Sequence, residues 1–108
     1  MTSVETIRSL ALELPEASEE DHFGAPSFRV RGKIFATLRP GRLTVKLASE
    51  DQHNLCQANP EAISPVPGYW GRKGSTFVDP DRIDDGLAET LLRLAWSGVA
   101  PKSLSRPG

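Results

Sequence analysis

Few side chains in this 108-residue sequence could take part in nucleophilic chemistry. Cys56 stands three residues after His53, a spacing at which a thiolate and an imidazole can meet on one face of a helix. Such a pair still needs an orienting carboxylate and an oxyanion hole, and neither is evident nearby. A lone cysteine beside a leucine is more often a small buried hydrophobe. We therefore predict that the protein is not an enzyme.

Metal and phosphate-loop patterns are equally sparse. His22 follows the acidic residues 19–21, Glu-Glu-Asp, but consecutive side chains diverge and the second histidine, His53, is distant in the chain. A single cysteine excludes an internal disulfide and a multi-cysteine metal centre. Residues 71–74, Gly-Arg-Lys-Gly, lack the spacing and the following Ser or Thr of a phosphate-binding loop. We expect no metal and no cofactor.

The basic residues offer a different chemistry, because they gather in the middle of the chain. Residues 22–78 hold eight bases and three acids, whereas the remainder holds five bases and eleven acids. The net charge of -1 and the pI of about 6.1 therefore conceal a positive centre. Such asymmetry favours a surface that faces a polyanion. Alternatively, strands carry Arg and Lys on their solvent face to discourage edge pairing.

Two aromatic residues accompany these bases. Tyr69 and Trp70 precede Arg72 and Lys73, and an aromatic ring beside bases can stack on nucleobases. The alternative is that both rings pack into the edge of a sheet. Trp96, in contrast, is expected in or near the core.

The strands that must position these bases are predicted from apolar alternation and from turn residues. A three-residue turn between the first two strands would pair Val30 with Ile34 and Phe28 with Ala36. Strands joined by short turns are antiparallel neighbours. The acidic residues 16–21 are expected to form a solvated linker. The predicted strands are 27–30, 34–38, 43–47, 69–71 and 76–78, with basic turns at 31–33 and 72–75.

Three helices are predicted from capping residues and helical spacing. The first two expected N-caps have Glu or Gln three residues later, which is the pattern of a capping box. Pro15, residues 59–60 and Gly98 would end the three helices. The order becomes helix, three strands, helix, two strands, helix, which defines an α+β domain. The expected N-caps are Thr2, Ser49 and Asp81.

Several segments in this order resemble the MmcQ/YjbR family. The resemblance covers nearly the whole chain and implies one α-β3-α-β2-α domain over residues 1–108, similar to secretion chaperones and CyaY. Members are commonly named as DNA-binding proteins, because their fold is similar to a double-wing arrangement. This chain has Ser75 and Thr76 where relatives place a tryptophan after the second hairpin turn. The matching segments are Leu14-Pro15, 21–30, 32–36, 43–47, Tyr69-Trp70, 91–96 and 100–102.

In a double-wing arrangement, the two basic turns would be the wings. Their glycines let the backbone approach a phosphate closely. We predict weak, salt-sensitive and largely nonspecific DNA binding, at roughly micromolar affinity or weaker. Acids at the start of the last helix argue against a recognition helix. The predicted nucleic-acid-binding residues are Arg29, Arg31, Lys33, Arg42, Lys46, Arg72 and Lys73.

A second hypothesis is a protein- or peptide-interaction module with no nucleic-acid role. It would use the exposed part of the sheet, with Phe35 and Tyr69 as anchors. The sequence has no apolar run near the roughly 20 residues of a membrane span, so no membrane association is expected. It also lacks the pattern of an export leader, and we expect a cytoplasmic protein.

Overall fold

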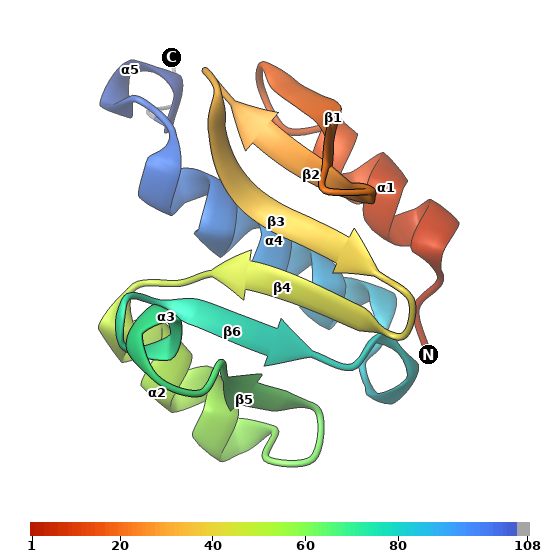
Figure 1. The fold of residues 1–108 in the computed structure, drawn as a ribbon, viewed down its shortest axis with the longest axis vertical. Coiled ribbons are helices and arrows are strands. Elements are labelled where there is room, and N and C mark those ends of the chain that lie inside the picture. Colours follow the sequence, from red (N-terminus) through yellow and green to blue (C-terminus); the bar gives the residue numbers. More distant parts are fainter. Residues whose placement is uncertain (106–108) are drawn as a thin grey trace.

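A six-stranded antiparallel sheet, in the order β1-β2-β3-β4-β6-β5, is the frame of the fold (Figure 1). The structure is a computed structural model and describes residues 1–105. The strands are β1 Ala17–His22, β2 Ala25–Val30, β3 Lys33–Arg39, β4 Arg42–Lys46, β5 Ile63–Pro65 and β6 Ser75–Val78. The helices are α1 Val4–Leu12, α2 Ser49–Ala58, α3 Tyr69–Arg72, α4 Asp85–Val99 and α5 Lys102–Ser105, with a 3-10 turn η1 at Pro80–Arg82.

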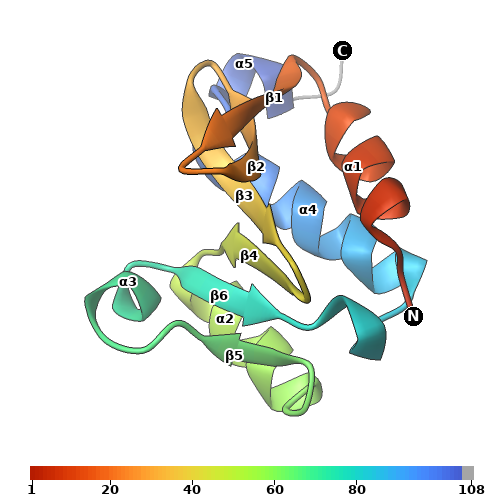
Figure 2. The ribbon, with the colours of Figure 1, turned by 45° about the vertical axis from the view of Figure 1, so that its right-hand side comes forward.

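Helices α1, α2 and α4 lie on one face of the sheet, and we call the opposite face the open face (Figures 1 and 2). The core lies on the helical side. In β4, Leu43 and Val45 are buried, whereas Thr44 between them is only half-buried, because successive strand residues point to opposite faces. Trp96 of α4 is buried as expected, and its indole N–H donates to the Pro15 carbonyl at 3.0 Å.

Strand β1 replaces the solvated linker that was expected at residues 16–21. It pairs with β2 along its whole length, from Ala17 opposite Val30 to His22 opposite Ala25. Its five residues after Ala17 are polar or charged, so no apolar alternation marks it as a strand. Backbone pairing with β2 defines it instead, and four successive strands rather than three therefore follow α1.

Helix α3 replaces the predicted strand at residues 69–71. The partner of β6 on that side is β5, with Ile63 opposite Val78. The segment 72–75 is therefore not a hairpin turn, and the second expected wing is absent from the described structure. Gly71 is essential to this path, because a Cβ at this position would lie 1.7 Å from the Val66 carbonyl oxygen.

The β2–β3 register matches the prediction only in part. Phe28 does pair with Ala36, but Val30 pairs with Lys33 rather than Ile34. The turn has two residues, Arg31 and Gly32, whose φ angles of 52° and 81° are both positive. Positive φ at both central positions is the requirement of a type I′ hairpin turn. A register shift between Phe28 and Arg29 absorbs the extra residue on β3.

The predicted helix caps are wrong by one to three positions. Ser3, not Thr2, caps α1 by accepting from the Thr6 N–H. The residue before α2 is Ala48, which makes no side-chain cap, and Asp84 rather than Asp81 caps α4. Each observed cap side chain accepts from a backbone N–H three residues later, which satisfies a donor that the helix leaves free.

Candidate functional site

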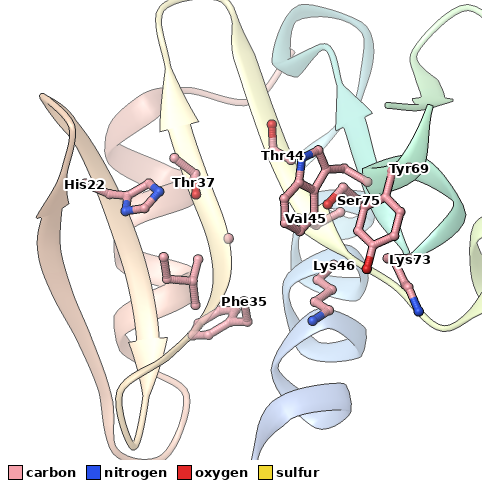
Figure 3. Close-up of a pocket in the computed structure, with 12 residues that line it drawn as sticks. His22, Phe35, Thr37, Thr44, Val45, Lys46, Tyr69, Lys73 and Ser75 are labelled. Atoms are coloured by element: carbon pink, nitrogen blue, oxygen red, sulfur yellow. The ribbon is translucent and has the colours of Figure 1, made fainter. Parts of the chain in front are cut away.

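A groove of about 510 Å³ crosses the open face of the sheet (Figure 3). Strands β3 and β4 form its floor, His22 at the end of β1 borders one side, and α3 borders the other. We call it the aromatic groove. Its lining residues are His22, Ile34, Phe35, Ala36, Thr37, Thr44, Val45, Lys46, Tyr69, Trp70, Lys73 and Ser75.

The floor of the aromatic groove combines apolar residues with hydroxyl side chains and carries no negative charge. Thr37 pairs with Thr44 across β3 and β4, so their hydroxyl-bearing side chains share one face. Ser75 pairs with Lys46 across β4 and β6. Aspartate and glutamate are absent from the residues that line the groove. The groove therefore offers hydrogen-bonding groups and cations to a ligand.

Two exposed aromatic side chains form the α3 side of the groove. Tyr69 is 56% exposed and Trp70 is 65% exposed, although both are large and apolar. Their rings meet edge to face, with centroids 5.2 Å apart and planes at 83°. The Lys73 ammonium lies 5.5 Å from the Tyr69 ring centroid, a cation–π distance.

Helix α3 has only four residues, and a side chain of α2 holds it in place. The Gln52 amide nitrogen lies 3.0 Å from the Gly71 carbonyl oxygen, 3.2 Å from that of Ser75 and 3.0 Å from the Thr76 hydroxyl. Its two N–H groups thus serve three acceptors. Thr76 is fully buried and donates in turn to the Gly74 carbonyl at 2.9 Å. These hydrogen bonds fix the position of α3, and with it Tyr69 and Trp70, relative to β6.

A second hollow adjoins the groove at the end of the sheet. It is lined by Arg31, Lys33, Lys46 and residues 98–102, and we call it the basic hollow. Lys46 borders both the groove and the hollow. The structure therefore brings together four of the predicted binding residues along one continuous surface: Arg31, Lys33, Lys46 and Lys73.

The predicted arginines of the first hairpin are instead engaged by acids. Arg31 makes a two-bond ion pair with Glu16, with its Nε 2.7 Å from one carboxylate oxygen. The Arg31 guanidinium, mainly by hydrogen bonding, lowers the pKa of the Glu16 carboxyl below its ordinary value, and Glu16 raises that of Arg31. Arg29 donates to the Ser27 hydroxyl at 3.1 Å and lies 4.0 Å from Glu20.

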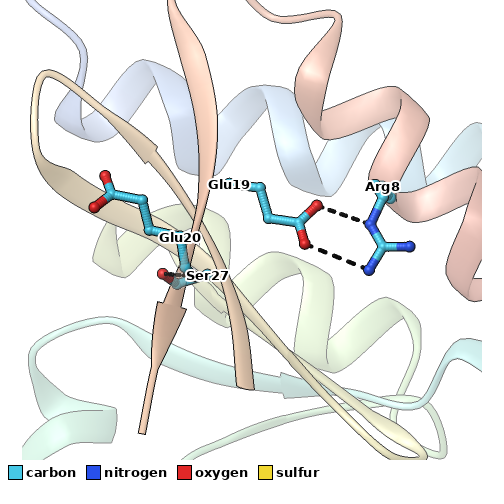
Figure 4. A network of polar contacts seen from close by, with 4 residues as sticks. All are labelled: Arg8, Glu19, Glu20 and Ser27. Carbon is cyan, nitrogen blue, oxygen red and sulfur yellow. Dashed lines mark hydrogen bonds and ion pairs between the residues drawn. The ribbon is translucent and has the colours of Figure 1, made fainter. Parts of the chain in front are cut away.

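Other acids of β1 face the helical side or the neighbouring strand. Glu19 binds Arg8 of α1 at 2.8 Å, and Glu20 accepts from the Ser27 hydroxyl through its backbone carbonyl (Figure 4). Alternate residues of β1 thus tie this edge strand to α1 on one face and to β2 on the other. Glu16 and Glu20, in the segment expected to be a linker, therefore pair with Arg31 and Arg29, which were predicted to bind nucleic acid.

The two remaining predicted residues lie away from the groove. Arg42 is at the opposite end of β4 from Lys46, and its guanidinium stacks over Phe77 at 4.1 Å from the ring centroid. Arg72 follows Trp70 by two residues but lines a separate hollow with Gln52 and residues 65–68. Arg72 and Lys73 are therefore neighbours in the sequence but line different hollows, and Arg42 and Lys46 lie at opposite ends of one strand.

The candidate thiol pair, His53 and Cys56, lies on α2 and does not line the aromatic groove. His53 and Cys56 line a hollow of about 470 Å³ beside α2, and no carboxylate lines it. Burial raises the pKa of the Cys56 thiol, which opposes thiolate formation. Within residues 1–105, no group of three or more His, Cys, Asp or Glu side chains is arranged to hold a metal ion.

Several groove residues carried no signal in the sequence. His22, Thr37, Thr44 and Ser75 belong to the groove only because the strand register places them on the open face. Phe35, expected as an exposed anchor, is 1% exposed and cannot serve as one. Apolar and polar residues near a bulge do not reveal their face from alternation alone.

Comparison with known proteins agrees with the fold just described. The chain belongs to the YjbR family, whose model matches residues 12–97. It is similar to the crystal structure of Deinococcus radiodurans protein DR2400, a DUF419 domain, with a TM-score of 0.78 and 27% identity over 99% of this chain and 91% of that one. No curated protein matches the sequence significantly. No helix within residues 1–105 has the length and apolar character of a membrane span.

Proposed function

We propose that this protein binds nucleic acid weakly and largely without sequence preference, through the aromatic groove and the basic hollow. The observation that carries the proposal is the position of Lys46 where the two surfaces meet, with Lys33 on one side and Lys73 on the other. Cations along a channel free of acids follow a phosphate backbone without reading bases. The proposal keeps the function predicted from the sequence but moves it from two wing tips to one face.

The number of available cations sets the expected strength. Lys33, Lys46 and Lys73 alone would release few counterions, so the affinity falls only moderately with salt, with a slope of about -0.9 per phosphate contact on duplex DNA. Base-specific readout is not expected, because α3 is too short for a recognition helix and α4 begins with Asp84 and Asp85. Both acids would repel phosphate at the N-terminus of α4, which lies on the helical side of the sheet.

Binding of a fluorescent oligonucleotide, followed by anisotropy at several salt concentrations, tests the proposal. The double variant Lys46→Gln, Lys73→Gln should weaken binding strongly and reduce the salt slope by about one per lysine. Arg72→Gln is the matched control, because Arg72 adjoins Lys73 in the sequence but lines another hollow. Equal weakening by the control, or no binding by the wild type at low salt, contradicts the proposal.

Backbone amide shifts in an NMR titration separate the two possible surfaces. Shifts at Lys33, Lys46 and Lys73 are expected on the proposed surface, with little change at Arg29. Shifts confined to the β2–β3 turn, with none at Lys46 and Lys73, would contradict the proposed surface. The protein- or peptide-interaction hypothesis retains Tyr69 but loses Phe35, and no observation on the groove favours it over nucleic acid.

A further inference from the structure

We infer that the aromatic groove takes an unpaired segment of nucleic acid, with one base stacked on Trp70 and its flanking phosphates held by Lys46 and Lys73. This inference rests on the proposed function and specifies which form of nucleic acid the surface prefers. It concerns single strands, because only an unpaired base can turn its ring face toward a protein side chain.

The exposure of the two rings is the first argument. A tryptophan normally buries most of its surface, yet Trp70 is 65% exposed on a helix whose position Gln52 and Gly71 fix. Exposed aromatic residues beside cations are the pattern with which proteins bind single strands. Phe23 is still more exposed, at 87%, but it stands at the β1–β2 turn and does not line the groove.

The ring geometry assigns different roles to the two aromatic residues. Lys73 lies over the Tyr69 ring, and the Tyr69 and Trp70 planes are nearly perpendicular. A base parallel to the Trp70 indole would therefore meet Tyr69 edge-on rather than face-on. Trp70 is the stacking surface, and Tyr69 sets its orientation and places Lys73 beside the base.

The dimensions and the floor of the groove favour a single strand over a duplex. The volume of about 510 Å³ lies within the range of small-molecule pockets. The ring faces of paired bases are covered by their neighbours in the stack, so only an unpaired base could enter with a free ring face. Thr37, Thr44 and Ser75 supply hydroxyls that both donate and accept. Such groups can contact any base edge, which agrees with binding that tolerates sequence.

The lysines of the groove are placed to hold the phosphates on either side of the stacked base. Lys46 and Lys73 both line the groove, and Lys46 continues into the basic hollow toward Lys33. A single-stranded nucleic acid lying along the basic hollow would place successive phosphates beside Lys33 and Lys46 before one of its bases reaches Trp70. Single strands release fewer counterions than duplex DNA, so the expected salt slope is about -0.7 per contact.

The test compares a thymidine oligonucleotide with a hairpin duplex of the same number of phosphates. The wild-type protein should bind the single strand about tenfold more tightly, which is within the range for stacking one base. Trp70→Ala should remove that preference, whereas the control Phe23→Ala should keep it. Circular dichroism verifies that both variants fold, as expected for two exposed side chains.

Tryptophan fluorescence gives a readout on the unaltered protein. Stacking of a base on Trp70 should quench its emission, while the buried Trp96 remains as an unquenched background. Equal affinity for both oligonucleotides, no quenching, or equal effects of Trp70→Ala and Phe23→Ala would overturn the inference. If the lysine variants still weakened binding in that case, the proposed function would stand. Failure of every oligonucleotide to bind would overturn both.

Discussion

The two halves of the sheet carry bases in different surroundings. In the half formed by β1, β2 and β3, Arg29 and Arg31 lie beside the carboxylates of Glu20 and Glu16. In the half formed by β4, α3 and β6, Lys46 and Lys73 line a groove without acids, next to exposed aromatic rings. The first half pairs both of these arginines with acids, whereas no acid is among the residues that line the groove beside Lys46 and Lys73.

This difference shows why the position of a base matters more than the number of bases. Solvent screens exposed ion pairs, so the pairs of Glu16 and Glu20 add little stability. Their larger effect is to remove positive charge from the hairpin that the sequence marked as a wing. Tyr69, Trp70 and the two lysines, in contrast, lie at the surface of the groove, where the proposed function gives them a ligand.

The largest expected effect tests whether the second half depends on its backbone path. Gly71→Ala would place a Cβ 1.7 Å from the Val66 carbonyl oxygen, so the loop before α3 must move. We expect destabilisation of about 3 kcal/mol, because a rigid backbone atom blocks the new side chain. Urea denaturation measures this change, and nucleic-acid binding should fall with it.

The matched control is Gly98→Ala in α4, where an added Cβ meets no atom within 4 Å. Alanine is the better helix former by about 1 kcal/mol at an interior position. The control should therefore leave stability unchanged or raise it. Equal stability of the two variants would mean that α3 has room to shift and that the groove wall is not fixed.

The next effect concerns the side chain that joins α3 to β6. Gln52→Ala would leave the Gly71 carbonyl and the buried Thr76 hydroxyl without their common donor. Loss of a donor to buried acceptors costs about 1–3 kcal/mol. Thermal unfolding measures the loss, and Gln57→Ala, on the exposed side of α2, is the control. A variant as stable as that control would contradict the role of Gln52.

Much of the fold was predictable, and the errors at β1 and α3 have physical reasons. Strands β3 and β4 follow from alternation, and α4 from its apolar stripe. Strand β1 has no apolar face, so only its pairing with β2 reveals it. Residues 69–71 favour a strand by aromatic composition, but packing on β6 and the contact with Gln52 impose a helical turn.

The site was predictable in composition rather than in arrangement. Lys33, Lys46 and Lys73 were expected to bind nucleic acid, and the structure places them along one surface. Arg31 was expected with them, but its partner Glu16 lies fifteen residues earlier, in the segment interpreted as a linker. Arg31 still lines the basic hollow, but its pairing with Glu16 depends on the β1–β2 pairing, which no local pattern could show.

The smallest expected effect concerns Glu16, because its removal should make the first half of the sheet more similar to the second. Glu16→Gln removes the partner of Arg31, whose guanidinium borders the basic hollow beside Lys33. The freed cation should add one phosphate contact and steepen the salt dependence of binding by about one. Glu13→Gln makes the same charge change at a position for which the described residues show no ion pair. Equal salt dependence of binding in the two variants would mean that overall charge, not Arg31, controls binding.

Titration of the same pair in the free protein gives an independent measure. The pKa of Glu16 is lowered from 4.5 mainly by its hydrogen bond with Arg31, so Arg31→Gln should raise it toward that value, as followed by carboxyl NMR. Because the folded-state pKa is the lower one, the pair stabilises the fold above the ordinary pKa of glutamate, and this contribution disappears as the pH falls through the lowered pKa. The two residues are exposed, so the stability change should be slight while the titration shift is clear. An unchanged Glu16 titration in Arg31→Gln would show that the acid is not committed to Arg31, and the first half of the sheet would then be as open to a phosphate as the second.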